Sequence, residues 1–513
     1  MKFPYRSTIL LSAVFIFCVF WNLLLAKYSQ NQQSPLKRAD NYNIVLIFID
    51  TLRADHLGCY GYSRKTSPNI DKLSKEAFVF EQNFATASYT LASFMSIITS
   101  LYPKSHGVLE VYKDRLSPRA KTLAQVLQSY GYETAWFGPK KSIHLNLDVG
   151  FGWGFNTTDI FIPRLDESRK LISDWLVRNK DKKFFLNFHT SNIHDPYMPS
   201  LKYKQRFAKN ESVRGIVEDE RWLMALCRQF VSQEKEKVRE IMGAELFEEF
   251  VATGSMGGSH KAVKDFFHSR NKAEVLHKIR DFVYWSSVNL EDPLVNAHMQ
   301  ALYDAEILEF DEEIIGPLVR QLKALNIYNK TIIIICADHG DEFYEHKGHG
   351  HGGTLFDELI HVPLIIRVPQ VKQGRRIKEL TQTVDIMPTL LDLVGIPVPH
   401  QAQGKSLIPL INNRGPFPIH DYVFGQILEI SYIRSKEWKL LLKENGIRKL
   451  YRVAQDPQEQ KNVYSENQDI ALRLESTLRQ LEAALPSYRE EEYSYPPEID
   501  EAAKERIRKT GYW

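Results

Sequence analysis

The stretch NIVLIFID (residues 43–50) is a continuous run of apolar, largely β-branched side chains that ends in an acid. A second run of the same design, TIIIICAD (residues 331–338), is followed directly by His339. Apolar runs of this length are typical of parallel strands that are buried on both faces. In open α/β sheets, ligands bind beyond the carboxyl ends of such strands. We therefore predict that Asp50, Asp338 and His339 meet at one edge of a sheet.

Two carboxylates and an imidazole at one sheet edge make a ligand set for a divalent cation. Either acid alone would more often cap the helix that follows its strand. Because both acids occur, with a histidine directly beside one of them, the metal site is favoured over two caps. An imidazole ligand favours zinc or manganese, and calcium stays open as the alternative cofactor.

The stretch ATASYTLASFMSIITSLYP (residues 85–103) places a hydroxyl residue, Thr90, just before a run that can form a helix over residues 92–99. A hydroxyl residue at the start of a helix is most often an N-cap. The same position also suits a nucleophile, because free backbone N–H groups and the helix dipole stabilise an alkoxide and an incoming anion. This stretch alone favours the N-cap, whereas its predicted neighbours favour the nucleophile.

Further motifs follow one another along the chain and cover nearly everything after residue 42. They are NIVLIFIDTLRADHLGCYGY (43–62), TSPNIDKLSKEAFVFEQNFA (66–85), YPKSHGV (102–108), GYETAWFG (131–138), HDPYMPS (194–200), ADHGDEFYEHKGHGHGGTLFDELIHVPLIIRVP (337–369), VDIMPTLLDLVGIPVP (384–399) and LYRVAQDPQEQKNV (450–463). In this order they resemble the sulfatase family of the alkaline phosphatase superfamily. The resemblance implies an α/β fold with a large, mostly parallel sheet sandwiched by helices and a smaller C-terminal antiparallel α+β subdomain.

The chain departs from the family pattern at the nucleophile. Family sulfatases carry a Cys or Ser that is converted to formylglycine, and the matching position here is Thr90. A threonine cannot become formylglycine. The Pro and Arg that follow in the family pattern are Ala92 and Phe94 here. The chain therefore resembles a sulfatase variant with Thr in place of the formylglycine residue.

The metal ligands that the resemblance implies also differ from the usual set. The paired Asp-Asp of the family is Asp50-Thr51 here, and the Asn that often follows the second metal-binding Asp is a histidine. A threonine nucleophile with these ligands is similar to superfamily members that cleave phosphate esters or diesters. The implied metal set is Asp50, Thr90, Asp338 and His339.

The resemblance implies two more histidines that contact the ester: His194, and either His349 or His351. His194 precedes Asp-Pro and could instead be a turn residue. His349 and His351 lie among glycines, which let a backbone approach a ligand closely, although such a run could also be a surface loop. The spacing to the following strand favours His351, and His349 stays as the alternative.

The N-terminus predicts a membrane segment. Lys2 and Arg6 precede an apolar run over residues 8–26, which is long enough to span a bilayer. A cleaved signal peptide is the competing interpretation, but the residues before Lys27 lack a small-x-small pattern. We predict a signal-anchor over residues 1–30, with the N-terminus in the cytoplasm and the catalytic domain in the periplasm, the extracellular space or a lumen.

The rest of the chain divides by composition and motif. Residues 31–42 are predicted to be a linker, 43–415 the catalytic domain with a helical insertion over about 204–300, and 416–513 the C-terminal subdomain and tail. A net charge of +3 over 513 residues argues against nucleic acid as a partner. The expected partners are an ester substrate on an envelope sugar, a lipid or a small molecule, and the membrane.

Together the residues predict a metal-dependent ester hydrolase that acts outside the cytoplasm. Cleavage of a phosphate mono- or diester through Thr90 is the favoured activity, because a metal-activated hydroxyl is a competent nucleophile. The alternatives are a sulfuric ester hydrolase without formylglycine, a membrane-anchored phosphotransferase and a non-catalytic binding protein.

Overall fold

The computed structural model describes most of the chain. The described residues are 41–110, 114–138, 147–160, 165–208, 220–252, 273–369, 371–414 and 418–489. The predicted signal-anchor and most of the predicted linker lie outside these ranges. Within them, no helix combines the length and the apolar character needed to cross a bilayer.

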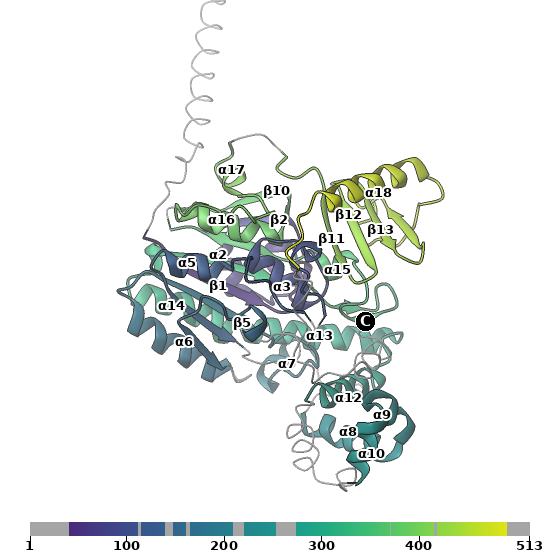
Figure 1. Cartoon of the computed structure of the whole chain (residues 1–513). Coiled ribbons are helices and arrows are strands. Elements are labelled where there is room, and N and C mark those ends of the chain that lie inside the picture. Colours follow the sequence, from purple (N-terminus) through teal and green to yellow (C-terminus); the bar gives the residue numbers. More distant parts are fainter. Residues whose placement is uncertain are drawn as a thin grey trace, which may run out of the picture.

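A sheet of eight strands forms the centre of the molecule (Figure 1). Its strands are β1 (Asn43–Ile49), β2 (Phe78–Phe84), β3 (Glu133–Gly138), β4 (Thr157–Ile160), β5 (Phe184–Thr190), β6 (Thr331–Ala337), β9 (Leu364–Arg367) and β10 (Arg375–Gln382). They lie in the order β10-β2-β9-β6-β1-β5-β3-β4, and β9 alone of these runs antiparallel to its neighbours. The two apolar runs that end in Asp50 and Asp338 are adjacent parallel strands, so the predicted, mostly parallel sheet is confirmed.

The sheet is buried on both faces because successive side chains of its strands point to opposite sides. On β1, Val45 and Ile47 belong to one hydrophobic core, whereas Ile44 and Leu46 belong to a second. The first core is covered by α6 (Leu165–Asn179), α13 (Pro293–Phe310) and α14 (Gly316–Ala324), and the second by α3 (Thr90–Thr99), α5 (Leu123–Ser129) and α16 (Ile386–Leu393). Each large apolar side chain buried in this way contributes roughly 1.5–3 kcal/mol.

A small C-terminal subdomain packs beside the main sheet, as predicted (Figure 1). It contains an antiparallel sheet of β11 (Val423–Ile427), β12 (Ile430–Arg434), β13 (Lys439–Lys443) and β14 (Arg448–Tyr451) and the helix α18 (Gln468–Ala483). Leu474 and Leu478 of α18 pack on Ile433 and Leu440 of the sheet. The described residues also form short elements that include α2 (Pro68–Ser74), α4 (Pro103–His106), β7 (Glu342–Phe343), β8 (His349–Gly350), α15 (Asp357–Ile360) and α17 (Ile408–Ile411).

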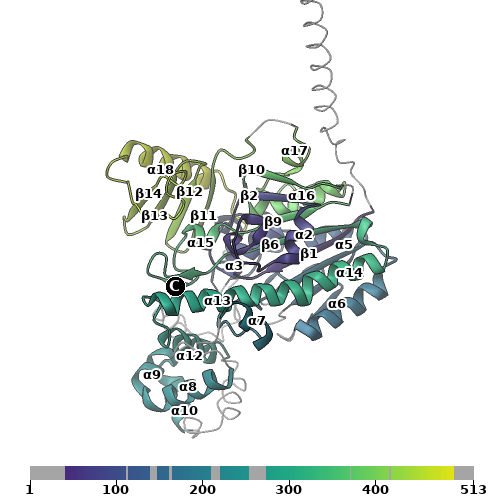
Figure 2. The ribbon, with the colours of Figure 1, turned by 180° about the vertical axis from the view of Figure 1, so that it is seen from behind.

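The stretch predicted as an insertion contains a group of helices that stands apart from the sheet. These are α8 (Glu220–Gln233), α9 (Lys235–Met242), α10 (Ala244–Ala252) and α12 (Ala273–Ser286). Both views show them clustered below α13, on the side of the molecule away from α17 and the C-terminal subdomain (Figures 1 and 2). The helix α7 (Leu201–Phe207) packs along α13.

His106 is a buried histidine that the core holds in its neutral form. It lies at the end of α4, where the backbone N–H of Val108 donates to its Nδ1 at 2.9 Å. Its Nε2 therefore carries the proton and donates to the Ser96 hydroxyl at 3.1 Å. Burial lowers the pKa of His106 to about 3.

We expect His106 to make the protein less stable as the pH falls. In the unfolded chain, His106 takes up a proton below about pH 6.5, whereas in the folded protein it takes one up only near pH 3. Between these two pH values protonation favours the unfolded chain, so the stability present above pH 6.5 is lost as the pH falls. Between pH 7 and pH 5 the loss is about 2 kcal/mol. The free energy of unfolding, measured by urea denaturation, should therefore fall by about 2 kcal/mol less between pH 7 and pH 5 for His106→Gln than for the wild type. The same substitution at exposed His400 is the control, and an unchanged pH dependence in His106→Gln would contradict the assignment.

Candidate active site

Thr90 is the first residue of α3, and its hydroxyl is directed into a buried site. The residue at the N-cap position is Tyr89, and no side-chain cap is formed there. The Thr90 Oγ1 lies instead 3.4 Å from Asp50 Oδ1 and 3.2 Å from His339 Nε2. The N-cap alternative for Thr90 is therefore wrong, and the helix begins two residues earlier than the predicted 92–99.

The predicted meeting of Asp50, Asp338 and His339 at the sheet edge is found in the structure. Ile49 and Ala337 are register partners on β1 and β6, which brings the following residues, Asp50 and Asp338, side by side. Ligand atoms of these two acids and of His339 all lie within 4.8 Å of one another, and all three residues are buried. His339 Nε2 is 3.6 Å from Asp50 Oδ1 and 3.4 Å from Asp338 Oδ2.

The ring of His339 is oriented for a role as a ligand. Its Nδ1 lies 2.9 Å from the carbonyl oxygen of Gly340, which can only accept, so the proton resides on Nδ1. Its Nε2 then presents a lone pair to Asp50, Asp338 and Thr90. Burial lowers the pKa of His339 to about 3, which keeps the ring neutral at pH 7. A metal-binding imidazole commonly has this second hydrogen bond to a carbonyl.

The two acids have the properties of a site that takes a cation. Burial, with a further contribution from Asp338, raises the pKa of Asp50 to about 6, and burial raises the pKa of Asp338 to about 6. Asp338 Oδ1 accepts from the backbone N–H groups of Thr51 and His339. Asp338 Oδ2 has no hydrogen-bond partner within the described part of the chain. Two adjacent buried carboxylates with an unused oxygen and a neutral imidazole fit a divalent cation.

Thr51, which replaces the second acid of the family pattern, shapes the chain after Asp50. Its φ of 59° lies in the left-handed region, which costs a β-branched residue roughly 1–2 kcal/mol. Its hydroxyl donates to the carbonyl of Ile193 at 3.0 Å, and its backbone N–H donates to Asp338. Thr51 therefore contributes hydrogen bonds that hold the site together, where the family pattern has a carboxylate.

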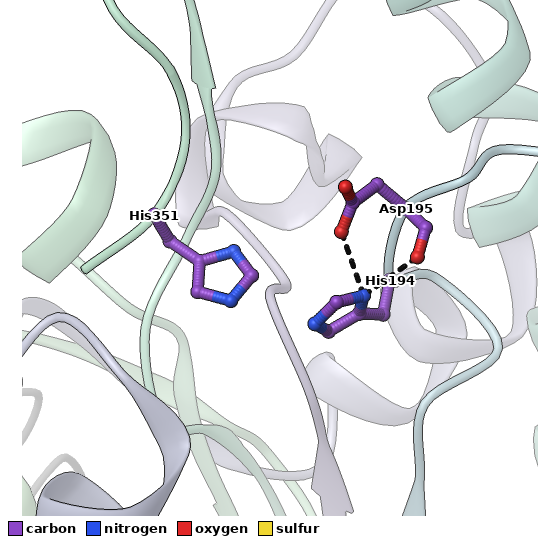
Figure 3. A group of neighbouring side chains, drawn as sticks. All are labelled: His194, Asp195 and His351. Atoms are coloured by element: carbon purple, nitrogen blue, oxygen red, sulfur yellow. Dashed lines mark hydrogen bonds and ion pairs between the residues drawn. The ribbon is translucent and has the colours of Figure 1, made fainter. Parts of the chain in front are cut away.

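His194 lies in a loop after β5 and is held by the residue that follows it. Its Nδ1 is 2.7 Å from Asp195 Oδ1 and 2.7 Å from the Asp195 carbonyl oxygen, and its other nitrogen points toward His351 (Figure 3). Burial alone would lower the pKa of His194. The Asp195 carboxylate outweighs this effect and raises that pKa well above its usual value. His194 is therefore held through Nδ1 by Asp195, with its Nε2 facing the site.

The structure distinguishes the two histidines of the glycine-rich loop. His351 lies over His339, with ring centroids 4.4 Å apart, and against His194 at 4.8 Å. Its Nδ1 is bonded to Asp341 Oδ1 at 2.8 Å. His349 is exposed and packs on Trp285 at 4.7 Å, at the rim of the site. The geometry thus brings His351 to Thr90 and its partners and leaves His349 further out.

Sequence reasoning missed three residues that hold the histidines. Asp195 and Asp341 each bind the Nδ1 of one histidine, and Trp285 donates to Asp195. The acids could have been suspected, because Asp195 directly follows His194 and Asp341 lies two residues after His339. Trp285 gives no such signal, since it lies in the insertion, 90 residues from its partner.

We expect Asp338→Asn to abolish tight metal binding. The substitution removes one negative charge and the unused oxygen from the site, so the affinity for Zn²⁺ or Mn²⁺ should fall at least about 100-fold. Calorimetric titration of the metal-free folded protein measures this. Asp392→Asn, which alters a carboxylate that accepts from Ser406, is the matched control and should leave the affinity unchanged. Equal affinities for both variants would rule the site out.

Comparisons with protein-family models agree with this fold and site. The model described as Sulfatase matches residues 42–396, and the model described as N-sulphoglucosamine sulphohydrolase, C-terminal, matches residues 347–484. Members of the sulfatase family generally bind a divalent metal ion.

Individual relatives are distant. An N-acetylglucosamine-6-O-sulfatase of Bacteroides thetaiotaomicron is 24% identical over 91% of this chain and 90% of its own. The human Arylsulfatase K is 28% identical over 36% of this chain and 37% of its own.

Two solved structures share the fold. A phosphonate monoester hydrolase of Agrobacterium radiobacter has a TM-score of 0.62 at 20% identity, over 86% of this chain and 95% of that one. A structure in complex with its substrate D-glucosamine-2-N,6-O-disulfate has a TM-score of 0.61 at 21% identity, over 88% of this chain and all of that one. Since the first family model covers well over half of the chain, this protein belongs to the sulfatase family and is a hydrolase of sulfuric or phosphoric esters.

Proposed function

We propose that this protein is a metal-dependent hydrolase of phosphate mono- or diesters in which Thr90 is the nucleophile. The observation that carries the proposal is the position of the Thr90 hydroxyl. It stands at the N-terminus of α3, within 3.4 Å of Asp50 and 3.2 Å of His339. A hydroxyl needs activation to attack an ester, and these neighbours are groups that hold a cation or accept a proton.

The chain's own residues suffice to position the ester and to manage the protons. The N-terminus of α3 attracts the anionic group through its free N–H donors. A cation bound by Asp50, Thr90, Asp338 and His339 would lower the pKa of the Thr90 hydroxyl and neutralise charge on the transferred group. Thr90 Oγ1 attacks phosphorus, its bond to phosphorus forms, and the bond to the leaving alcohol breaks. The Thr90 proton leaves toward Asp50 Oδ1, its hydrogen-bond acceptor.

His194 is suited to protonate the leaving alcohol. Its Nδ1 is bound to Asp195, so its free Nε2 is the atom that can donate to the ester oxygen. The resulting neutral imidazole then accepts a proton from a water molecule that attacks the phosphothreonine. The bond between Thr90 Oγ1 and phosphorus breaks, the proton held by Asp50 returns to Thr90 Oγ1, and the phosphate product is released. His351, held by Asp341 beside it, contacts the ester oxygens in this scheme. His349 at the rim contacts the alcohol part.

The natural substrate is proposed to carry its ester on a sugar, because one relative is an N-acetylglucosamine-6-O-sulfatase and one similar structure holds D-glucosamine-2-N,6-O-disulfate. We place the reaction outside the cytoplasm, with the chain anchored by residues 1–30, whose basic start and apolar run support this orientation. Zinc or manganese is the proposed cofactor because an imidazole is among the ligands. A sulfuric ester is the second candidate substrate, and the family membership favours it.

We expect Thr90→Ala to abolish turnover and Thr90→Ser to retain part of it. Loss of the nucleophilic hydroxyl should lower kcat/KM at least about 1,000-fold. Hydrolysis of 4-nitrophenyl phosphate, bis(4-nitrophenyl) phosphate and 4-nitrophenyl sulfate, with zinc, manganese or calcium, measures it and identifies the ester class. Thr99→Ala removes a hydroxyl from the other end of the same helix and should be fully active. Sulfate turnover that survives Thr90→Ala would overturn the mechanism.

A further inference from the structure

The last helix of the insertion ends against the loop that carries His194. Trp285, near the end of α12, donates from Nε1 to Asp195 Oδ2 at 2.6 Å. The other oxygen of the same carboxylate binds His194 Nδ1 at 2.7 Å. Each oxygen of Asp195 therefore has one partner, one from the insertion and one from the site. These bonds form a direct chain from Trp285 through Asp195 to His194.

Two more contacts tie the end of α12 to the site. The hydroxyl of Tyr284 accepts from the backbone N–H of Tyr197 at 3.2 Å, which fixes the loop two residues beyond Asp195. The ring of Trp285 packs on His349, in the loop that also carries His351. The insertion thus contacts both loops that bring histidines to Thr90.

The bond from Trp285 matters because a carboxylate can orient an imidazole only if it is itself fixed. Asp195 is only 9% exposed, so water cannot easily replace its partners. An indole N–H can only donate, so Asp195 is the acceptor of this hydrogen bond, which favours its ionised form. Without the indole donor, Asp195 can rotate about its side-chain bonds, and the direction of His194 Nε2 rotates with it. Small errors in the direction of an acid reduce proton transfer in the transition state.

We propose that Trp285 is a positioning residue for the ester hydrolysis: through Asp195 it holds His194 in the orientation that protonates the leaving alcohol. The helical insertion is then a working part of the active site. This inference rests on the proposed function, in which His194 is the acid.

The test uses the dependence of kcat/KM on the leaving group. An alcohol that leaves poorly needs protonation, whereas 4-nitrophenolate leaves without it. In the full-length, metal-loaded protein, Trp285→Phe keeps the aromatic ring and removes the N–H. We expect its kcat/KM to fall about 10-fold or more for benzyl phosphate and less than about 2-fold for 4-nitrophenyl phosphate. A merely structural role would lower both values by the same factor.

Matched variants separate this inference from the proposal on which it rests. His194→Ala should show the same leaving-group dependence with a larger loss, and adding Trp285→Phe to it should cause no further change. Trp153→Phe, at a half-buried tryptophan beside Arg115, controls for the loss of an indole elsewhere. Asp195→Asn is the second route to the same effect, should Trp285→Phe fold poorly.

The outcomes are distinct. A Trp285→Phe protein with wild-type kcat/KM for both esters, or with equal losses for both, overturns the positioning role. A further loss when Trp285→Phe is added to His194→Ala does the same. If His194→Ala itself shows no leaving-group dependence while Thr90→Ala is inactive, the assignment of His194 as the acid fails. If Thr90→Ala is active, the proposed function fails as a whole.

Discussion

Two carboxylates placed side by side at the ends of adjacent parallel strands are the constraint on which the rest of the site depends. The register of β1 and β6 fixes Asp50 next to Asp338, and both are buried. Such a pair repels, and each acid has a raised pKa, so the arrangement favours the uptake of a cation or a proton. The surrounding groups offer what a cation needs: the lone pair of His339 and the hydroxyl of Thr90. The sheet therefore creates a place suited to a cation, and the elements around it complete the site.

The part of this design that depends on strand pattern and pairing is predictable from the sequence. The apolar runs before Asp50 and Asp338 predict buried parallel strands, and parallel strands place their ends together. Thr90 is harder, because a helix start predicts a cap as readily as a nucleophile, and the contacts that exclude the cap come from other segments. The relation between Trp285 and Asp195 is beyond pattern reasoning, since it depends on how a separate group of helices packs against a loop. Periodicity reports local structure, whereas such contacts are set by the tertiary fold.

The C-terminal subdomain contributes to the site through the loop of residues 341–351. His346 in that loop binds Glu358 through Nδ1 and the carbonyl of Glu459 through Nε2, and its ring stacks on Phe356. Glu459 in turn pairs with the fully buried Lys439 of β13. From the opposite side, Arg53 binds the carbonyl of Asp341 and the carboxylate of Glu345. The loop that delivers His351 is thus held at its start by Arg53 and near its middle by His346, which restricts the glycine-rich segment that follows.

A threonine nucleophile imposes its own demand on the second half of the proposed reaction. Once its single hydroxyl oxygen is bonded to phosphorus, Cβ carries no second oxygen that could expel the group by forming a carbonyl. The phosphothreonine must then be cleaved by attack at phosphorus, from the side opposite Thr90, by water or another acceptor. That attack needs a base, and a histidine that has just donated its proton to the leaving alcohol is one. His194 can act in both halves only if its direction stays fixed between them, and its buried partner Asp195 supplies that constraint. In the proposed mechanism, a threonine at the nucleophile position therefore depends on the Asp195 carboxylate that fixes His194.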